Sequence, residues 1–175
     1  MIIWPEAQEK NYLDNSNIQR AYQERMQTLN NHLIFQDMQH IHHPISGALK
    51  EKYNSAIMIN NHGQQVDRYQ KMKRIPFGEY TPILKQDSTM AAWASGFFGD
   101  FFGEFNSELS QGKKHKVFSH PLVNMIPLIC YETTFPEFVG QAVQQTLTQD
   151  NSSKGTILVG LSNDGWFGST HLSYQ

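Results

Sequence analysis

The feature that most constrains the fold is a pair of compact apolar runs separated by one helical pattern. The runs, Pro127 to Cys130 and Thr156 to Leu161, have the length and composition of buried strands. Between them, after Pro136, apolar side chains recur at helical spacing at positions 138, 142, 143 and 147. Strand, helix and strand in this order imply a parallel crossover. The sequence therefore predicts an α/β fold, with the only cysteine, Cys130, at the end of a buried strand.

The first 70 residues predict further elements of the same fold. Met1 to Trp4 is a short apolar run that ends at Pro5, and it is expected to be a strand that delivers Glu6 at its carboxyl end. Ser16 and Gln19 resemble a helix capping box. The helix that follows is predicted from an apolar stripe with spacings of four, four, three and four: Ile18, Tyr22, Met26, Leu29 and Leu33.

A second group of strands is expected before Lys71. Leu33 to Phe35 can begin a strand, whereas Gln39 to Gly47 has the composition of a loop. Ser55 to Ile59 and Val66 to Tyr69 flank an Asn-Asn-His-Gly sequence, which is typical of a hairpin turn. Lys71 then follows the outgoing strand of that hairpin.

Residues 84–116 have neither a clean helical nor a clean strand period. Glycines are scattered among the aromatic side chains, which argues against a packed helix and favours a mobile apolar lid, although some of the rings can also belong to the core. The aromatic residues are Trp93, Phe97, Phe98, Phe101, Phe102 and Phe105.

Composition limits the classes of function. With 175 residues, 39% of them hydrophobic, the chain is long enough for one globular domain, and no internal linker is evident. A formal charge of −2 gives no footprint for nucleic acid, and the short run at Lys113, Lys114 and Lys116 does not change that expectation. One cysteine cannot form an intramolecular disulfide. No stretch is apolar enough for a spanning helix or ordered like a signal peptide, so the chain as given is expected to be soluble.

Cys130, Glu6 and Lys71 together supply the groups of an acyl-transfer site. A thiol attacks an acyl carbon as thiolate, and with a free pKa of about 8.5 it needs help at neutral pH. Glu6 can take that proton, return it to the leaving group and then deprotonate a second nucleophile. Lys71 and a backbone N–H near Cys130 are the expected donors to the oxyanion, and Glu79 is predicted to fix the lysine or the attacking group as an auxiliary residue.

Each of these residues also has an ordinary structural interpretation. A lone cysteine in an apolar strand is more often inert core, and Lys71, Glu6 and Glu79 taken singly are typical surface or turn residues. The combination is what favours catalysis. His40, His42 and His43 lack a partner at recognised ligand spacing, so a surface loop is favoured over a metal site.

The ordered motifs resemble the nitrilase superfamily, and within it the catalytic domains of bacterial apolipoprotein N-acyltransferases. The resemblance runs from Trp4 to Gln175. Its pieces are Trp4-Pro5-Glu6, Tyr53-Asn54-Ser55-Ala56, Tyr69-Gln70-Lys71, Ile75-Pro76-Phe77-Gly78-Glu79-Tyr80, Ile129-Cys130-Tyr131-Glu132, Phe135-Pro136-Glu137 and Ser162-Asn163-Asp164-Gly165-Trp166-Phe167-Gly168.

The resemblance implies an αββα sandwich in which Glu6 is the general base, Lys71 the oxyanion-stabilising lysine and Cys130 the nucleophile, with Glu79 nearby. It implies transfer of an acyl chain from a phospholipid, through a cysteine thioester, to the N-terminal amine of a diacylglyceryl-cysteine apolipoprotein, with no cofactor and no metal. The pocket is then expected to be shaped by substrate-binding residues Tyr131, Glu132 and Trp166.

Family members also carry membrane-spanning helices before the region that matches Trp4 and further strands after the region that matches Gln175. Residues 1–175 are therefore expected to form a partial catalytic domain of a protein of the bacterial inner membrane, facing the periplasm and contacting the membrane through parts missing here and through residues 93–105. A soluble nitrilase-type amidase acting on a small amide or nitrile is the alternative, and a binding module without turnover is a third reading.

Overall fold

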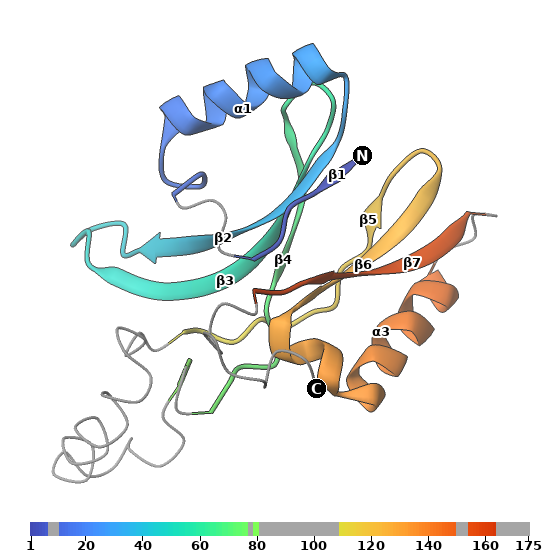
Figure 1. Cartoon of the computed structure of the whole chain (residues 1–175). Coiled ribbons are helices and arrows are strands. Elements are labelled where there is room, and N and C mark those ends of the chain that lie inside the picture. Colours follow the sequence, from blue (N-terminus) through green and yellow to red (C-terminus); the bar gives the residue numbers. More distant parts are fainter. Residues whose placement is uncertain (7–10, 77–78, 81–108, 150–153, 164–175) are drawn as a thin grey trace, which may run out of the picture.

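The computed structural model describes residues 1–6, 11–76, 79–80, 109–149 and 154–163. These residues form two β-sheets that face each other, with one helix on the outside of each sheet (Figure 1). The aromatic residues 93–105, together with Trp166, lie outside the described residues.

The first sheet has the strand order β1-β2-β3-β4. Strand β1 (Ile2–Ile3) pairs in parallel with β2 (Leu33–His42), and β2 pairs antiparallel with β3 (Leu49–Ile59). Strand β4 (Gln65–Gln70) completes the predicted hairpin with β3. Its turn contains Gly63 at φ +74°, a left-handed conformation that glycine adopts without steric cost. The expected strand before Lys71 is thereby confirmed.

The second sheet confirms the crossover expected from the apolar pattern. Strand β5 (Phe118–Ser119) pairs antiparallel with β6 (Val123–Ile129), and β6 pairs in parallel with β7 (Gly155–Leu161). The chain passes from β6 to β7 through a short 3₁₀ helix η1 (Cys130–Thr134) and helix α3 (Pro136–Gln149). Cys130 is the first residue after β6.

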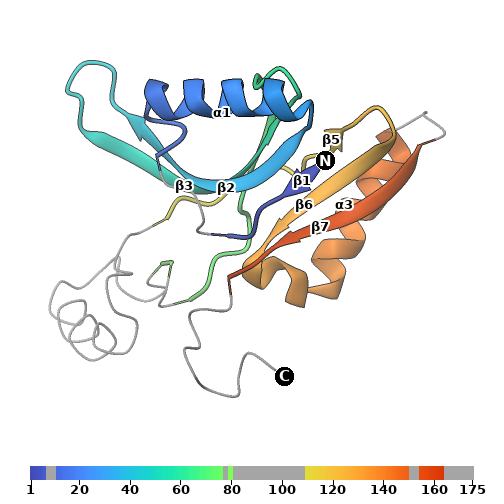
Figure 2. The same ribbon diagram turned by 45° about the horizontal axis from the view of Figure 1, so that its top comes forward.

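Helix α1 (Ser16–Leu29) covers the outer face of the first sheet (Figure 2). Along β2 and β3 the side chains alternate between the two faces of the sheet, as the pleat requires. Leu33, Phe35, Ile57 and Ile59 point toward α1 and pack with Tyr22 and its neighbours, whereas the residues between them point the other way. The helix therefore covers the part of this face that the start of β2 and the end of β3 form.

The opposite face of the first sheet packs on the second sheet. Ile34, Ala56, Met58 and Tyr69 of the first sheet share one buried cluster with residues of the second sheet. The contributions from the second sheet are Phe118, Met125, Ile129, Val159 and Leu161. Helix α3 lies on the far side of that sheet, with Phe138 and Ala142 buried (Figure 2). The order helix, sheet, sheet, helix is the predicted αββα sandwich.

Three predictions about local structure were wrong. Residues 39–42 are strand and not loop, because β2 continues to His42 and pairs with the first half of β3. The cap of α1 is Asn15, whose side chain accepts hydrogen bonds from the N–H groups of residues 17 and 18, and Ser16 is the first helical residue. Leu33 does not belong to the helical stripe, because Asn30 ends α1 in a left-handed conformation. It begins β2, which confirms the strand predicted from Leu33 to Phe35.

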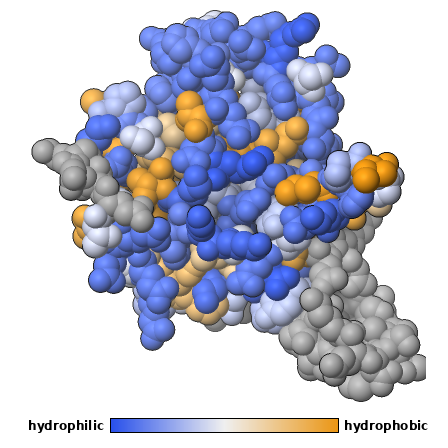
Figure 3. Space-filling model, turned by 180° about the vertical axis from the view of Figure 1, so that it is seen from behind, coloured by the Kyte–Doolittle hydropathy of each residue, from blue (hydrophilic) through white to orange (hydrophobic). Residues whose placement is uncertain are grey.

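The outer surface seen from behind is mostly hydrophilic, with separate apolar patches (Figure 3). Ile45, in the β2–β3 turn, and Leu122, in the β5–β6 turn, are the most exposed large apolar side chains among the described residues. Neither α1 nor α3 has the length and apolar character that crossing a membrane demands, and no other helix in the described parts of the chain does.

Candidate active site

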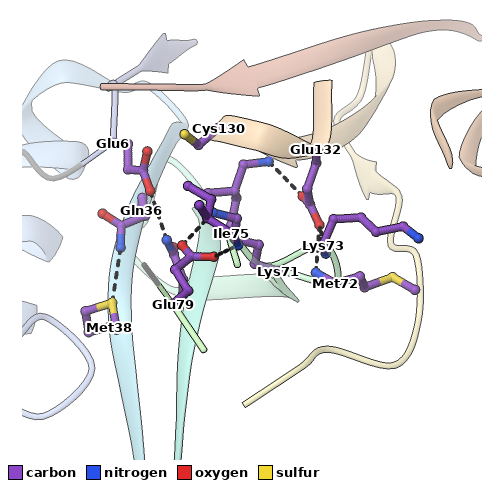
Figure 4. Close-up of polar contacts among 12 residues, drawn as sticks. Glu6, Gln36, Met38, Lys71, Met72, Lys73, Ile75, Glu79, Cys130 and Glu132 are labelled. Carbon is purple, nitrogen blue, oxygen red and sulfur yellow. Dashed lines mark hydrogen bonds and ion pairs between the residues drawn. The ribbon is translucent and has the colours of Figure 1, made fainter. Parts of the chain in front are cut away.

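The three predicted catalytic residues come from the ends of three strands. Glu6 lies three residues beyond β1, Lys71 directly follows β4, and Cys130 directly follows β6. The first two strands belong to one sheet and the third to the other, so the site lies at the boundary between the two sheets. Figure 4 shows Glu6, Lys71, Glu79 and Cys130 gathered at this point.

Lys71 and Glu79 form a buried ion pair. The Lys71 Nζ lies 2.6 Å from Oε1 of Glu79, and the two side chains are only 2% and 5% exposed. The other oxygen of Glu79 accepts a hydrogen bond of 2.9 Å from the Ile75 N–H, which fixes the carboxylate to the loop between them. Burial of this kind excludes the interpretation of Lys71 as a solvated surface lysine. Its remaining N–H groups are available to a developing negative charge.

Glu6 is held through one of its two carboxylate oxygens. Its Oε1 accepts a hydrogen bond of 2.9 Å from Nδ2 of Asn54, while Oε2 is buried and has no hydrogen-bond partner among the described residues. Burial raises the pKa of Glu6, and this rise is partly offset by the Asn54 amide and by the charge of Lys71. A carboxyl group whose pKa is moved toward neutrality is well suited to general-base catalysis.

Cys130 is half-buried beside Glu6 and has an unusual backbone conformation. Its φ is +49°, in the left-handed region that residues other than glycine rarely adopt. Burial raises the pKa of the Cys130 thiol, and the neighbouring Glu6 carboxylate raises it further, whereas Lys71 and the Tyr131 N–H lower it. The thiol therefore rests in its protonated form at neutral pH, and a base must remove its proton when it reacts.

Glu132 is fully buried and accepts four hydrogen bonds from donors in the described parts of the chain. Its Oε1 accepts from the Tyr69 hydroxyl at 2.7 Å and from the N–H groups of Met72 and Lys73 at 2.6 and 3.0 Å, and its Oε2 accepts from the Ile129 N–H at 2.8 Å. These bonds tie the turn that carries Cys130 to the loop that follows Lys71 (Figure 4). Contact of Glu132 with substrate stays a prediction. The four hydrogen bonds indicate a second role, which is to position the turn that carries Cys130.

The other two predicted pocket residues are placed less fully. Tyr131 is at the surface, 36% exposed, and its ring packs edge-on against Phe135 with 4.8 Å between ring centres. Trp166 lies outside the described residues, so its contribution to a pocket stays a prediction.

Two residues that contact predicted site residues received no role from the sequence. Asn54 binds Glu6, and Tyr69 binds Glu132, although both occur in motifs that carry the family resemblance. A signal for Asn54 was present in the strand pattern. It lies two residues before Ala56 and four before Met58, so a polar side chain occupies an inward-facing position of a buried strand.

The histidine group at the end of β2 is not arranged as a metal centre. His40 and His42 lie in the strand, not in the predicted loop, and Nδ1 of His40 contacts Oδ2 of Asp14 at 2.6 Å. In the described ranges of the chain, no three His, Cys, Asp or Glu side chains are grouped so that they could hold a metal ion.

Comparison with known proteins identifies the family of the chain. The model of the carbon-nitrogen hydrolase family matches residues 1–169. The chain belongs to this family. Among solved structures, this carbon-nitrogen hydrolase is similar to an amidase from Nesterenkonia sp. AN1, with a TM-score of 0.51, 15% identity, and coverage of 86% of this chain and 45% of the other. A variant of that amidase in complex with butyramide gives a TM-score of 0.52 at 14% identity, with coverage of 86% and 44%. These likenesses show the fold.

Curated relatives of the carbon-nitrogen hydrolase are named apolipoprotein N-acyltransferase. The protein from Rhizobium leguminosarum bv. trifolii is 30% identical over 129 residues, which cover 74% of this chain and 21% of the relative. The one from Rickettsia typhi is 29% identical, covering 71% and 22%, and the one from Shewanella oneidensis is 26% identical, covering 100% and 32%. The chain thus spans between about a fifth and a third of the length of these relatives.

Proposed function

We propose that the chain is the catalytic part of an N-acyltransferase, which moves an acyl chain from a phospholipid to the N-terminal amine of a diacylglyceryl-cysteine lipoprotein. The observation that carries this proposal is the meeting of Glu6, Lys71 and Cys130 at the boundary between the sheets, in a chain whose curated relatives are named apolipoprotein N-acyltransferase.

In the first half-reaction, Cys130 takes the acyl group from the phospholipid ester. Glu6 removes the thiol proton as Sγ bonds to the ester carbon, and the electrons of the C=O bond move to its oxygen. Lys71 and a backbone N–H near Cys130 stabilise that oxyanion, and each such donor contributes about 10²- to 10³-fold to the rate. When the oxyanion collapses, the glycerol oxygen leaves with the proton held by Glu6, and a thioester remains on Cys130.

In the second half-reaction, the amine of the acceptor attacks the thioester carbon. Glu6 takes a proton from the amine as the C–N bond forms, and the second tetrahedral intermediate uses the same oxyanion donors. Its collapse breaks the C–S bond, and Glu6 returns the proton to the sulfur. One carboxylate therefore serves both steps. Its raised pKa supports this role, and so does Oε2, which has no hydrogen-bond partner among the described residues.

The remaining site residues have supporting roles in this proposal. Glu79 holds Lys71 through the buried ion pair, and Glu132 holds the turn of Cys130. Tyr131 and Trp166 are proposed to line the entrance for the two substrates, and residues 93–105 to contact the membrane surface that supplies the acyl donor. The reaction needs no cofactor, and the proposed location is the periplasmic face of the bacterial inner membrane.

A soluble-type amidase is the second candidate, because the solved structures of similar fold include an amidase. In an amidase, ammonia or an amine leaves when the thioester forms, and water then hydrolyses the thioester. In the acyltransferase, an amine is the nucleophile that attacks the thioester. The two functions differ in their acyl donor and in the identity of the second nucleophile.

Mass spectrometry of the complete gene product tests the proposal. The protein is incubated in detergent with phosphatidylethanolamine, and its intact mass and peptide map are recorded with and without hydroxylamine. We expect a hydroxylamine-labile acyl adduct on Cys130, no adduct in Cys130→Ala, and discharge of the adduct to an added diacylglyceryl-cysteine peptide. Release of a free acid from butyramide, without any adduct from phospholipid, would favour the amidase. A folded wild-type protein without either reaction would leave only the binding module.

A further inference from the structure

We propose that Asn54 is a positioning residue that directs the Glu6 carboxylate at the Cys130 thiol and fixes its place relative to Lys71. This inference rests on the proposed function, because it concerns the same three catalytic residues. Asn54 lies in β3, a strand that carries none of them.

The side chain of Asn54 selects which oxygen of Glu6 can act as the base. Its Nδ2 donates to Oε1 at 2.9 Å, and Oε2 is left without a hydrogen-bond partner among the described residues. Figure 4 shows Glu6 and Cys130 facing each other across the site. Because one oxygen is engaged, the carboxylate cannot rotate freely, and the free oxygen is the one available to the thiol.

The backbone of Asn54 binds the second catalytic residue. The N–H of Lys71 donates to the carbonyl oxygen of Asn54 at 2.8 Å, one residue beyond the last pair of the β3–β4 ladder, Ser55 and Gln70. The same residue therefore contacts Glu6 through its side chain and Lys71 through its main chain. A shift of β3 would move Glu6 and Lys71 together, so the base and the oxyanion donor keep their positions relative to each other.

The contact with Glu6 requires a hydrogen-bond donor at this position, and the amide of Asn54 supplies it. Asn54 is 5% exposed, and its Oδ1 is buried without a partner among the described residues. A buried acceptor without a partner is unfavourable, so stability alone does not account for this side chain. The carboxylate accepts and cannot donate, which fixes the amide with its nitrogen toward Glu6.

Loss of the amide has an electrostatic consequence that a purely structural residue would lack. The charged and titratable groups that face Glu6 are Lys71, Glu79 and Cys130. Burial raises the pKa of Glu6, and the Asn54 hydrogen bond is the largest of the influences that lower it again. Without that bond, less of Glu6 is ionised at a given pH, so the base works only at higher pH.

The test is the pH dependence of Cys130 reactivity in three variants of the complete gene product. Iodoacetamide is the probe, since alkylation of the single described thiol needs no acyl donor, and acyl-adduct formation from phosphatidylethanolamine is measured in parallel. Asn54→Ser keeps a donor, Asn54→Ala removes it, and Asn54→Asp adds a carboxylate. Asn17→Ala, on the exposed face of α1, is the control.

We expect the acidic limb of both profiles to move to higher pH in the order Ser, Ala and Asp, by about one pH unit for Asn54→Ala. The apparent pKa values belong to the coupled Glu6 and Cys130 pair. The control should follow the wild type.

A uniform loss of rate at every pH would overturn the inference, and so would unmoved profiles in variants that remain folded by circular dichroism. Failure of all three variants to fold would also overturn it, because Asn54 would then be required for the structure itself. If the wild type forms no acyl adduct but the alkylation profiles still shift in this order, the proposed function fails and the role of Asn54 stands.

Discussion

Replacing Glu132 by glutamine tests the hydrogen-bonded link between the two sheets. All four partners of the carboxylate are donors: three on Oε1 and the Ile129 N–H on Oε2. A glutamine that keeps its oxygen toward the three donors turns its NH₂ toward the Ile129 N–H. A buried donor without an acceptor costs about 1–3 kcal/mol, and the three remaining bonds lose the added strength of a charged acceptor. We expect a loss of about 3 kcal/mol in the free energy of unfolding.

One effect opposes this loss and makes the experiment decisive. Burial raises the pKa of Glu132, which means that its ionised form is penalised in the folded state, and glutamine removes that penalty. If desolvation outweighs the hydrogen bonds, Glu132→Gln will be neutral or stabilising. Such a result, within about 0.5 kcal/mol of wild type or above it, would refute the reasoning.

The measurement is urea unfolding followed by circular dichroism, with Glu24→Gln as the control for loss of an exposed carboxylate. Tyr69→Phe removes only one of the four donors and should cost about 0.5–1.5 kcal/mol. The double variant with Glu132→Gln should be less destabilised than the sum of the two single variants, because they share one bond. Strict additivity would mean that the bond between Tyr69 and Glu132 contributes nothing.

Three further predictions concern the base, the nucleophile and the hairpin. Glu6→Gln should slow acyl-adduct formation by about 10²- to 10⁴-fold. Because burial raises the folded pKa of Glu6, the wild type should lose stability relative to this variant as the pH rises from about 4. If the free energy of unfolding, measured in urea, changed with pH equally in both proteins, this sign would be contradicted. Cys130→Gly and Cys130→Ala should both be inactive. The free energy of unfolding in urea should be roughly 0.5–1 kcal/mol higher for the glycine variant than for the alanine variant, because φ at this position is +49°. A less stable glycine variant would argue against backbone strain. Gly63→Ala should destabilise by at least about 2 kcal/mol in thermal unfolding, because a Cβ would overlap the backbone of Gln23. Gly140→Ala, with open space in α3, should stabilise slightly, and similar effects of the two changes would contradict the close approach.

The sequence predicted the crossover, the hairpin and the strand ends because each depends on local pattern. Cys130 at the end of β6 follows from an apolar run, and Lys71 after β4 follows from turn residues and alternation. The extent of β2 was not predictable in this way. Residues 39–42 contain two histidines and read as polar loop, yet they form strand because β3 supplies hydrogen-bond partners along their length.

The polar contacts of the site were also beyond local reasoning. The bond from Asn54 to Glu6 joins residues 48 positions apart, and the bond from Tyr69 to Glu132 joins residues 63 apart. Periodicity places each side chain on a face of its own strand, but it does not say which side chains of distant segments it will meet. The order of the strands in the first sheet decides the partner of Asn54, and the docking of the two sheets decides the partner of Tyr69.

The position of the site between two separately connected sheets has a consequence for folding kinetics. Each sheet with its helix can form from nearby segments of the chain, whereas the contacts of Glu132 with the residues after Lys71 close loops of about 60 residues. Contacts of such long range form slowly and late. In a refolding experiment, recovery of Cys130 reactivity should therefore lag behind recovery of secondary structure. The reactivity of the thiol would then report when the two sheets dock.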